Sequence, residues 1–329
     1  MLGRSSGLRV LGLVVGLCFG SFAAADVVAG DKVDNQPFRR YSTNDTLGRQ
    51  VSFYLSEPAA THESFPLIVF VQGTGCSSHF RGSEGRVIKG IPNLLHDVVG
   101  QRARVLAVDK VGVEFLDDQG DRPIQEACRP RFFQEHTLER WTEAIASSIR
   151  AAHALPSVDG RRTLVVGISE GSMVAVRVAN VLSEVTHAAS LSGGGPNHLH
   201  VLAEYVRRRG FDPEESVYGC WARVRTNPDS TTDFCLDHPY RHWSSFYQTS
   251  LIEECLRSKA KLYIVHGSAD EQNFVHGFDV LRAELAAKGV TAVFERLDGA
   301  GHGLNLPGQQ PPAGLLAVFG RLAAWFLED

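Results

Sequence analysis

The chain has 329 residues, of which 43% are hydrophobic and 21% are charged, and its formal net charge is −4. These proportions are those of an ordinary globular protein and exclude a disordered or fibrous chain, while the mildly acidic charge excludes long-range attraction to nucleic acid or to anionic membranes. A chain of this length can bury a full core without disulfides to hold it.

The first 25 residues differ from the rest. Arg4 and Arg9 precede an apolar run over residues 10–22, and Ala23-Ala24-Ala25 follows. A charged start, a short apolar stretch and an Ala-x-Ala end are typical of a secretory signal peptide, which we expect to be cleaved before Asp26. The apolar run has about 13 residues, whereas a membrane-spanning helix needs about 20. Stable membrane insertion is therefore not expected.

Cleavage at this point leaves residues 26–329 as one predicted domain, secreted or periplasmic, whose formal net charge is −6. An uncleaved N-terminal anchor is the alternative. Lipidation of Cys18 is disfavoured because bulky Leu17 occupies the position where lipoprotein signals need a small residue.

Strands and helices alternate along most of the mature chain. Residues 67–71 form a continuous β-branched and aromatic run, which is typical of a strand covered on both faces. Similar runs predict strands at 105–109, 163–167, 188–191, 262–265 and 291–297, and two short strands are expected before them at 38–42 and 49–55, on either side of the turn-rich residues 44–48. Apolar residues at helical spacing predict helices over 137–154, 172–182, 278–288 and 314–326. The alternation predicts an α/β fold with a mostly parallel sheet and helices on both faces.

One segment breaks this alternation. Residues 197–259 carry turn residues, three cysteines and many aromatic side chains, and they predict a lid-like insertion. Insertions over strand ends often contact substrate, but a flap that serves only for packing fits the same sequence.

The strongest chemical signal is Gly167-Ile168-Ser169-Glu170-Gly171, which lies between a predicted strand and a predicted helix. In that context G-x-S-x-G indicates a nucleophile elbow, a sharp turn that needs small flanking residues. Ser169 is the candidate nucleophile.

A serine nucleophile needs a base that a third group orients. His302 stands between Gly301 and Gly303 on the loop after the last predicted strand, and Asp270 follows the strand before it. Glu271 is the competing acid. We expect Ser169, Asp270 and His302 to form a catalytic triad, and the other histidines to be surface, lid or core polar residues.

The two N–H groups of an oxyanion hole are expected from the residue after the serine, Glu170, and from the loop after residues 67–71. That loop reads Gln72-Gly73-Thr74-Gly75-Cys76, and we assign the Thr74 N–H. A plain glycine turn is the alternative.

Five cysteines remain after residue 25, and an exported chain meets an oxidising compartment, so one or two disulfides are expected with at least one thiol left over. Cys220 with Cys235 closes a short loop and is the first candidate pair. The sequence contains neither CxxC nor HExxH, so we expect no metal and no cofactor.

These motifs together resemble the α/β-hydrolase superfamily, in particular its dienelactone-hydrolase-like and prolyl-oligopeptidase-like members. The resemblance covers about residues 65–329 and is most specific at 167–171, 266–270 and 301–303. It implies the α/β-hydrolase fold. It departs from the family at Gln72, where such enzymes commonly have histidine, and no propeller domain precedes the hydrolase region.

The expected function is that of a serine hydrolase of small carboxylic esters, acting through an acyl-enzyme on Ser169. A peptidase or amidase with the same triad is one alternative. It would need an amine pocket, for which the insertion offers acidic residues Glu214, Glu215, Asp229, Asp233 and Asp237. An acyltransferase and a non-catalytic binding protein are further alternatives, and neither nucleic-acid binding nor an oligomeric state is predicted.

Overall fold

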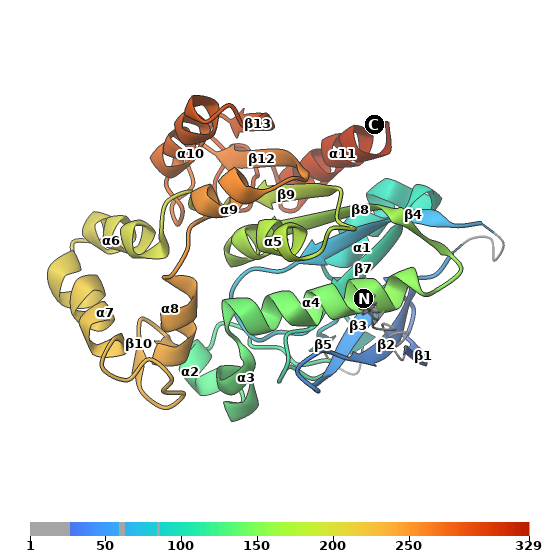
Figure 1. The fold of residues 1–329 in the computed structure, drawn as a ribbon, viewed down its shortest axis with the longest axis horizontal. Helices are drawn as coiled ribbons and strands as arrows, with labels where there is room; N and C mark the ends of the chain where they lie inside the picture. The colour runs from blue at the N-terminus through green and yellow to red at the C-terminus, as the bar shows by residue number, and fades with distance from the viewer. Residues whose placement is uncertain (1–26, 59–62, 84–85, 329) are drawn as a thin grey trace, which may run out of the picture.

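The computed structural model describes residues 27–58, 63–83 and 86–328, so the predicted signal peptide lies outside it. Within those residues a nine-stranded sheet forms the centre of the molecule, in the order β1-β2-β3-β7-β4-β8-β9-β12-β13 (Figure 1). The strands are β1 (Val28–Lys32), β2 (Phe38–Asn44), β3 (Gln50–Ser56), β4 (Phe65–Val71), β7 (Arg104–Val108), β8 (Val158–Ile168), β9 (His187–Leu191), β12 (Lys261–Gly267) and β13 (Ala292–Leu297).

The sheet has an antiparallel edge and a parallel body. The pairs β1–β2, β2–β3 and β3–β7 are antiparallel, and every pair from β7 to β13 is parallel. Because parallel strands end on the same side, the loops that follow β4, β7, β8, β9, β12 and β13 converge at one edge of the sheet. This carboxyl edge is where ligands bind in open α/β sheets.

Helices cover both faces of the sheet. In β4, Leu67 and Val69 pack with α4 (Leu138–His153), α5 (Glu170–Val181), α9 (Leu251–Arg257) and α10 (Val275–Ala287), whereas Ile68 and Phe70 face α1 (Ile91–Val99) and α11 (Ala313–Leu327). Two apolar faces on one strand explain its unbroken hydrophobic run. Shorter elements are η1 (Gly100–Arg102), α2 (Ile124–Ala127), α3 (Pro130–Glu135), β5 (Gly82–Ser83) and β6 (Arg86–Val87).

The strands and helices that periodicity predicts are all present, with bounds shifted at their ends. The longest predicted helix, α4, begins after Thr137, whose side chain accepts a hydrogen bond from the N–H of Arg140 as an N-cap. Sequence periodicity did not predict α1, which starts with Ile91-Pro92-Asn93. Among the described helices, none combines the length and apolarity required to cross a bilayer.

The segment expected to be irregular is largely helical. It contains α6 (His198–Arg208), a π-helical turn (Glu214–Tyr218), α7 (Gly219–Val224), the small hairpin β10 (Phe234–Cys235) and β11 (His238–Pro239), and α8 (Tyr240–Phe246). Figure 1 shows α6, α7 and α8 together to one side of the sheet. Helix α9 instead packs on α5, where the Glu254 carboxylate accepts hydrogen bonds from Arg177 and Asn180. The part that stands apart from the sheet layers therefore ends before α9.

The cysteine pairing follows this arrangement. Cys220 and Cys235 form a disulfide inside the insertion, as their short spacing predicts. A second disulfide joins Cys76 to Cys128, and the remaining thiol of the described chain, Cys255, is buried. The first bridge links two parts of the insertion, and the second links the loop after β4 to the segment before α3.

Candidate functional site

Ser169 lies on a strained turn between β8 and α5. Its backbone adopts φ 57° and ψ −123°, a conformation with positive φ that residues other than glycine rarely adopt. A Cβ at Gly167 would overlap the carbonyl oxygen of Gly171, and a Cβ at Gly171 would come within 2.6 Å of the Val71 carbonyl oxygen. Both glycines are therefore required for the strand and helix to approach at this turn, which presents the serine at the carboxyl edge.

Asp270 and His302 form a close pair on the loops after β12 and β13. The Nδ1 atom of His302 lies 3.0 Å and 2.9 Å from the two carboxylate oxygens of Asp270. Asp270 is only 3% exposed, and its Oδ1 also accepts hydrogen bonds from the N–H groups of Gln272 (2.8 Å) and Asn273 (2.9 Å). These contacts hold the carboxylate in place, and the carboxylate holds the imidazole.

The competing acid, Glu271, has a different contact. Its Oε2 accepts a hydrogen bond from the backbone N–H of His302 at 3.4 Å, so it touches the loop rather than the ring. Asp270 and Glu271 are neighbours in sequence, but the turn points their carboxylates in different directions. Only the Asp270 carboxylate contacts the His302 ring.

Ser192 joins the loops that carry Ser169 and His302. The Ser192 hydroxyl donates to the carbonyl oxygen of His302 at 2.8 Å, and Asn273 Nδ2 donates to the carbonyl oxygen of Ser192 at 2.7 Å. The preceding residue, Leu191, accepts a hydrogen bond from the N–H of Ser169 at 2.9 Å. The carboxyl end of β9 therefore connects the turn that carries Ser169 to the Asp270–His302 pair.

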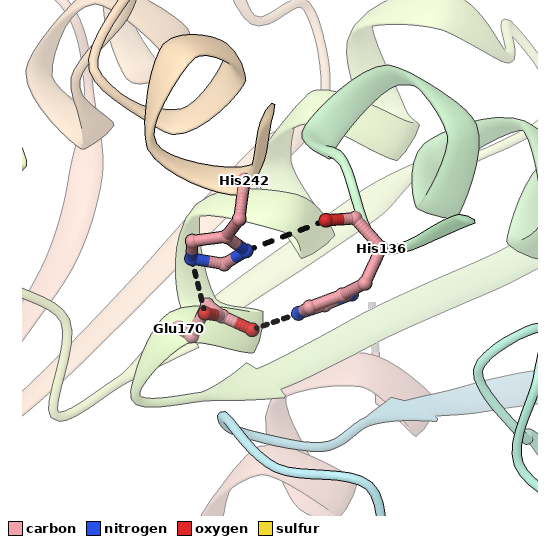
Figure 2. A group of neighbouring side chains, drawn as sticks. All are labelled: His136, Glu170 and His242. Atoms are coloured by element: carbon pink, nitrogen blue, oxygen red, sulfur yellow. Dashed lines mark hydrogen bonds and ion pairs between the residues drawn. The ribbon is translucent and has the colours of Figure 1, made fainter. Parts of the chain in front are cut away.

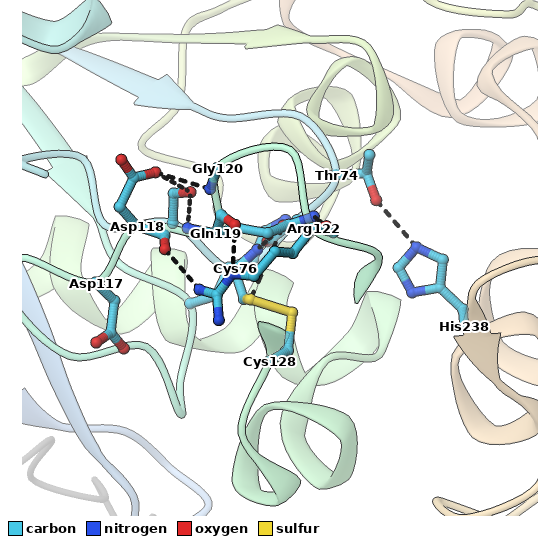
Figure 3. Close-up of a disulfide and its surroundings, with 12 residues drawn as sticks. Thr74, Cys76, Asp117, Asp118, Gln119, Gly120, Arg122, Cys128 and His238 are labelled. Atoms are coloured by element: carbon cyan, nitrogen blue, oxygen red, sulfur yellow. Dashed lines mark hydrogen bonds between the residues drawn. A yellow bond between two sulfur atoms is a disulfide. The ribbon is translucent and has the colours of Figure 1, made fainter. Parts of the chain in front are cut away.

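The loop after β4 lies against the serine. A Cβ at Gly73 would sit 3.1 Å from the Cβ and 3.7 Å from the Oγ of Ser169. Thr74 follows, and its hydroxyl forms a 3.0 Å hydrogen bond with Nε2 of His238 from β11 (Figure 3). Two residues further on, Cys76 carries the disulfide to Cys128, so the loop is held both by the insertion and by the segment between α2 and α3.

The side chain of Glu170 points away from solvent into a cluster of basic groups. His136 Nε2 lies 3.0 Å from its Oε1 and His242 Nε2 lies 3.4 Å from its Oε2, while His242 Nδ1 faces the carbonyl oxygen of His136 (Figure 2). Lys110, two residues after the end of β7, places its Nζ 3.5 Å from Oε1. We call Glu170, Lys110, His136 and His242 the Glu170 cluster.

Burial sets the charge states in this cluster. It lowers the pKa of His136 to about 4 and shifts that of His242 well below the usual range. Burial also lowers the pKa of Lys110 to about 8, against the attraction of Glu170. Burial opposes ionisation of Glu170, but its basic neighbours hold the pKa of that carboxyl well below the usual range. At neutral pH the cluster therefore contains one carboxylate, one ammonium and neutral imidazoles.

His136, Glu170 and His242 are residue types that bind zinc, and their donor atoms lie within 4.8 Å of one another. The Lys110 ammonium is 3.5 Å from the same carboxylate and only 1% of its side chain is exposed. A divalent cation on this carboxylate would meet a buried positive charge at close range, where repulsion is strong. The arrangement fits an ion pair with hydrogen-bonding histidines, and we assign no metal to it.

A cavity of about 310 Å³ opens beside Ser169. Its walls come from the loop after β4, from the Asp270 loop and, for the most part, from α6, α8 and the hairpin of the insertion. The side chains are mainly apolar or aromatic and include Ile124, Val201, Leu202, Tyr205, Trp243 and Phe246. Trp243 and Phe246 border the cavity, and Trp243 also packs with Trp221 and Tyr247 in the insertion's own core.

Comparison with known proteins identifies structures that share this fold. No protein-family model matches the sequence, and no curated protein matches it either. Among solved structures, dipeptidyl peptidase 4 from Porphyromonas gingivalis is 13% identical with a TM-score of 0.60, over 89% of this chain and 36% of that one. An acylaminoacyl peptidase from Pyrococcus horikoshii is 16% identical with a TM-score of 0.58, over 88% and 41%. An acetyl xylan esterase from Paenibacillus sp. R4 is 16% identical with a TM-score of 0.57, over 92% and 88%.

The protein has the α/β-hydrolase fold. It spans less than half the length of the two peptidases and most of the length of the esterase. At these identities the likeness concerns the fold, and the chemistry has to be argued from the site.

Within this α/β-hydrolase fold the five residues singled out from sequence lie at one edge of the sheet. Ser169, Thr74 and Glu170 line the cavity together. Asp270 and His302 contact each other, and the Asp270 loop contributes Gln272 and Asn273 to the wall.

Sequence reasoning missed Lys110, His136 and the specific contacts of His238 and His242. One signal was available for Lys110: the charged pair Asp109-Lys110 directly follows a buried strand, at the edge where the other site residues gather. No comparable local signal marks His136, because its partner Glu170 belongs to a distant part of the sequence.

Proposed function

We propose that this chain is a serine hydrolase that cleaves carboxylic esters of small molecules. The observation that carries the proposal is the Asp270–His302 pair at the edge of the sheet where Ser169 stands on its strained turn. A buried carboxylate that binds Nδ1 leaves the other ring nitrogen, Nε2, free to act as a base.

In the proposed reaction, Ser169 Oγ attacks the acyl carbon while His302 Nε2 takes the hydroxyl proton. The N–H groups of Thr74 and Glu170 stabilise the oxyanion, and Asp270 stabilises the imidazolium. The ester C–O bond then breaks, and His302 returns the proton to the leaving alcohol. Water, activated by His302, attacks the acyl-enzyme in the same way and releases the acid.

The mainly apolar wall of the cavity supports esters, while one acidic residue on that wall, Asp237, supports the peptidase alternative. A substrate recognised by its amino terminus needs a free carboxylate near the serine. Of the five acidic residues that the insertion offered, Asp237 borders the cavity, and Glu214, Glu215, Asp229 and Asp233 are not among its lining residues. Glu170 also borders it but is already bound in its cluster. A mainly apolar wall of this volume suits the hydrocarbon part of a small ester.

The test is covalent labelling with a fluorophosphonate probe, read by intact and peptide mass. We expect one adduct, on Ser169, which His302→Ala abolishes. The control is Ser183→Ala, a serine exposed beyond the end of α5. Labelling elsewhere, or labelling that survives in His302→Ala, would overturn the proposed mechanism, and a folded protein without any labelling would favour the binding-protein alternative.

The choice between ester and amide is tested with two substrates that share one acyl group, p-nitrophenyl butyrate and butyryl p-nitroanilide. Turnover of the ester without detectable cleavage of the anilide supports the proposal, and cleavage of the anilide would identify an amidase or peptidase. Adding an alcohol measures transfer: an ester product that exceeds hydrolysis would identify an acyltransferase.

We also propose that the protein is exported, with residues 1–25 removed. The two disulfides support an oxidising compartment. Fractionation of cells that express the full chain, followed by mass analysis, should find the exported protein beginning at Asp26. A chain that retains its first 25 residues in the membrane fraction would identify the anchor alternative.

A further inference from the structure

Lys110 makes an unusual set of contacts for a lysine. Its side chain is 1% exposed, and its Nζ donates hydrogen bonds to the carbonyl oxygens of Gly73 (2.7 Å) and Gly75 (3.0 Å). Nζ also lies 4.3 Å from the centre of the Trp141 ring. Burying a charge is costly unless the charge is paired. The contacts of the Lys110 ammonium must therefore offset the cost of burying it. It binds the two carbonyl groups on either side of Thr74.

Peptide geometry gives these contacts a direction. The carbonyl of Gly73 and the N–H of Thr74 belong to one planar trans peptide group, in which the two point in opposite directions. When Lys110 fixes the oxygen, it also fixes where the N–H points, away from Lys110. A loop with glycine at positions 73 and 75 has little intrinsic stiffness of its own. The second bond, to Gly75, limits rotation on the other side of Thr74.

Glu170 completes the arrangement. Its backbone N–H is the other donor in the proposed oxyanion hole, and its carboxylate lies 3.5 Å from the same Nζ. His136 and His242 hold that carboxylate from α3 and α8. One buried ion pair therefore connects both halves of the proposed hole, because Lys110 holds one loop and Glu170 belongs to the other.

Neighbouring contacts follow the same pattern. Asp109, adjacent to Lys110, accepts a hydrogen bond from the N–H of His79 at 2.9 Å and from the hydroxyl of Ser78 at 3.0 Å. The end of β7 thus binds the loop after β4 at two places, through a cation near its start and an anion further along. This end of the strand serves as a support for that loop.

We propose that Lys110 is a positioning residue that orients the Thr74 N–H toward the oxyanion, with Glu170 compensating its charge. This rests on the proposed hydrolase function. Lys110 does not touch substrate, since its Nζ is occupied by the two carbonyl groups and the carboxylate. Its loss leaves Ser169, Asp270 and His302 in place and weakens stabilisation of the transition state.

The test compares Lys110→Met/Glu170→Gln with the unmodified protein. The double change removes both buried charges, so neither is left unpaired. Loss of one oxyanion-hole donor costs about 100- to 1,000-fold in kcat, and a donor that is misoriented rather than removed should cost about 10- to 100-fold. We expect kcat for p-nitrophenyl butyrate to fall by that factor while KM changes by less than about threefold. Lys89→Met, which removes an exposed cation, is the control.

A transition-state analogue separates positioning from general damage. A trifluoromethyl ketone adds to the serine and forms an oxyanion, so its Ki should rise by the same factor by which kcat/KM falls. Butyramide, a neutral analogue whose carbonyl stays planar, forms no oxyanion, and its Ki should change little. A folded double variant with unchanged kcat, or an equal rise in both Ki values, would overturn the proposal.

Lys110→Arg covers the case in which the double variant does not fold. It keeps a cation beside Glu170, but a planar guanidinium on a different stem cannot occupy the position of the ammonium. We expect a folded protein with reduced kcat, and wild-type kcat would overturn the proposal. Failure of the proposed function would look different, because the unmodified protein would then show neither labelling nor ester turnover.

Discussion

Two groups of carboxylate and histidine lie at the carboxyl edge of the sheet, and they differ in what surrounds them. In the first, Asp270 is buried but the His302 side chain is 14% exposed. In the second, Glu170 and His136 are both buried, and Lys110 supplies a compensating charge. The first has a partly exposed ring, which suits the proposed role of exchanging protons with a substrate. The second is closed and charge-balanced, which suits a support.

If the proposed roles are right, the difference shows that residue types alone do not separate a reactive group from a supporting one. Both groups contain a carboxylate within hydrogen-bond distance of an imidazole. Solvent access and the charge already present decide which imidazole can act as a base, because burial disfavours the imidazolium that a base must become.

The largest effect is expected in the first group. Asp270→Asn should lower kcat by about 1,000- to 10,000-fold, because an amide neither orients the imidazole correctly nor stabilises its charged form. Glu271→Gln, the matched control, should change kcat by about fivefold at most, the equivalent of roughly 1 kcal/mol for one hydrogen bond. Ester turnover and melting temperature are measured for both. Equal losses in the two variants would remove the distinction between the carboxylates.

The next effect concerns stability in the Glu170 cluster. Glu170→Gln leaves the Lys110 ammonium buried without its partner, and removal of one member of a buried ion pair costs about 3–5 kcal/mol. Urea unfolding at pH 7 should show this decrease, and adding Lys110→Met should restore most of it. Glu184→Gln, at an exposed position after α5, should stay within about 0.5 kcal/mol of the unmodified protein. If Glu170→Gln matches that control, the cluster is not an ion pair.

A smaller effect should appear in acid. Burial lowers the pKa of His136 from 6.5 to about 4, so the unfolded chain binds more protons than the folded one between these values. The stabilisation is present above about pH 6.5 and is lost as pH falls toward 4, by about 3 kcal/mol for this residue alone. The free energy of unfolding from urea titrations at pH 7.5, 6 and 5 should decrease in that order, and less steeply in His136→Gln. A flat profile in the unmodified protein would contradict the neutral buried imidazoles.

The smallest expected difference is between the disulfides. The Cys76–Cys128 bridge closes a sequence separation of 52 residues and Cys220–Cys235 one of 15. By loop-closure entropy, double alanine replacement should cost about 4 kcal/mol for the first pair and about 3 kcal/mol for the second. The first should also lower kcat more, because its loop carries Thr74. If loss of Cys220–Cys235 lowered kcat more, the insertion rather than the loop after β4 would be the part that positions the site.

Sequence patterns predicted the parallel sheet and its covering helices because hydrophobic periodicity is local. Each face of β4 can be identified from alternate residues, and each helix from its own spacing. The candidate residues could also be identified from sequence for a local reason. Ser169, Asp270 and His302 each follow a strand at a glycine-rich turn, and parallel strands bring such turns to one edge.

What the tertiary structure decided was the partner of each side chain. Lys110, His136 and His242 meet Glu170 across separations that no sequence window spans, and their contacts depend on how α3, α8 and β7 pack around one carboxylate. The same holds for the bridge from Cys76 to Cys128, a pair that no spacing in the sequence predicted. Local sequence determines where a side chain begins, and packing of distant elements determines what it reaches.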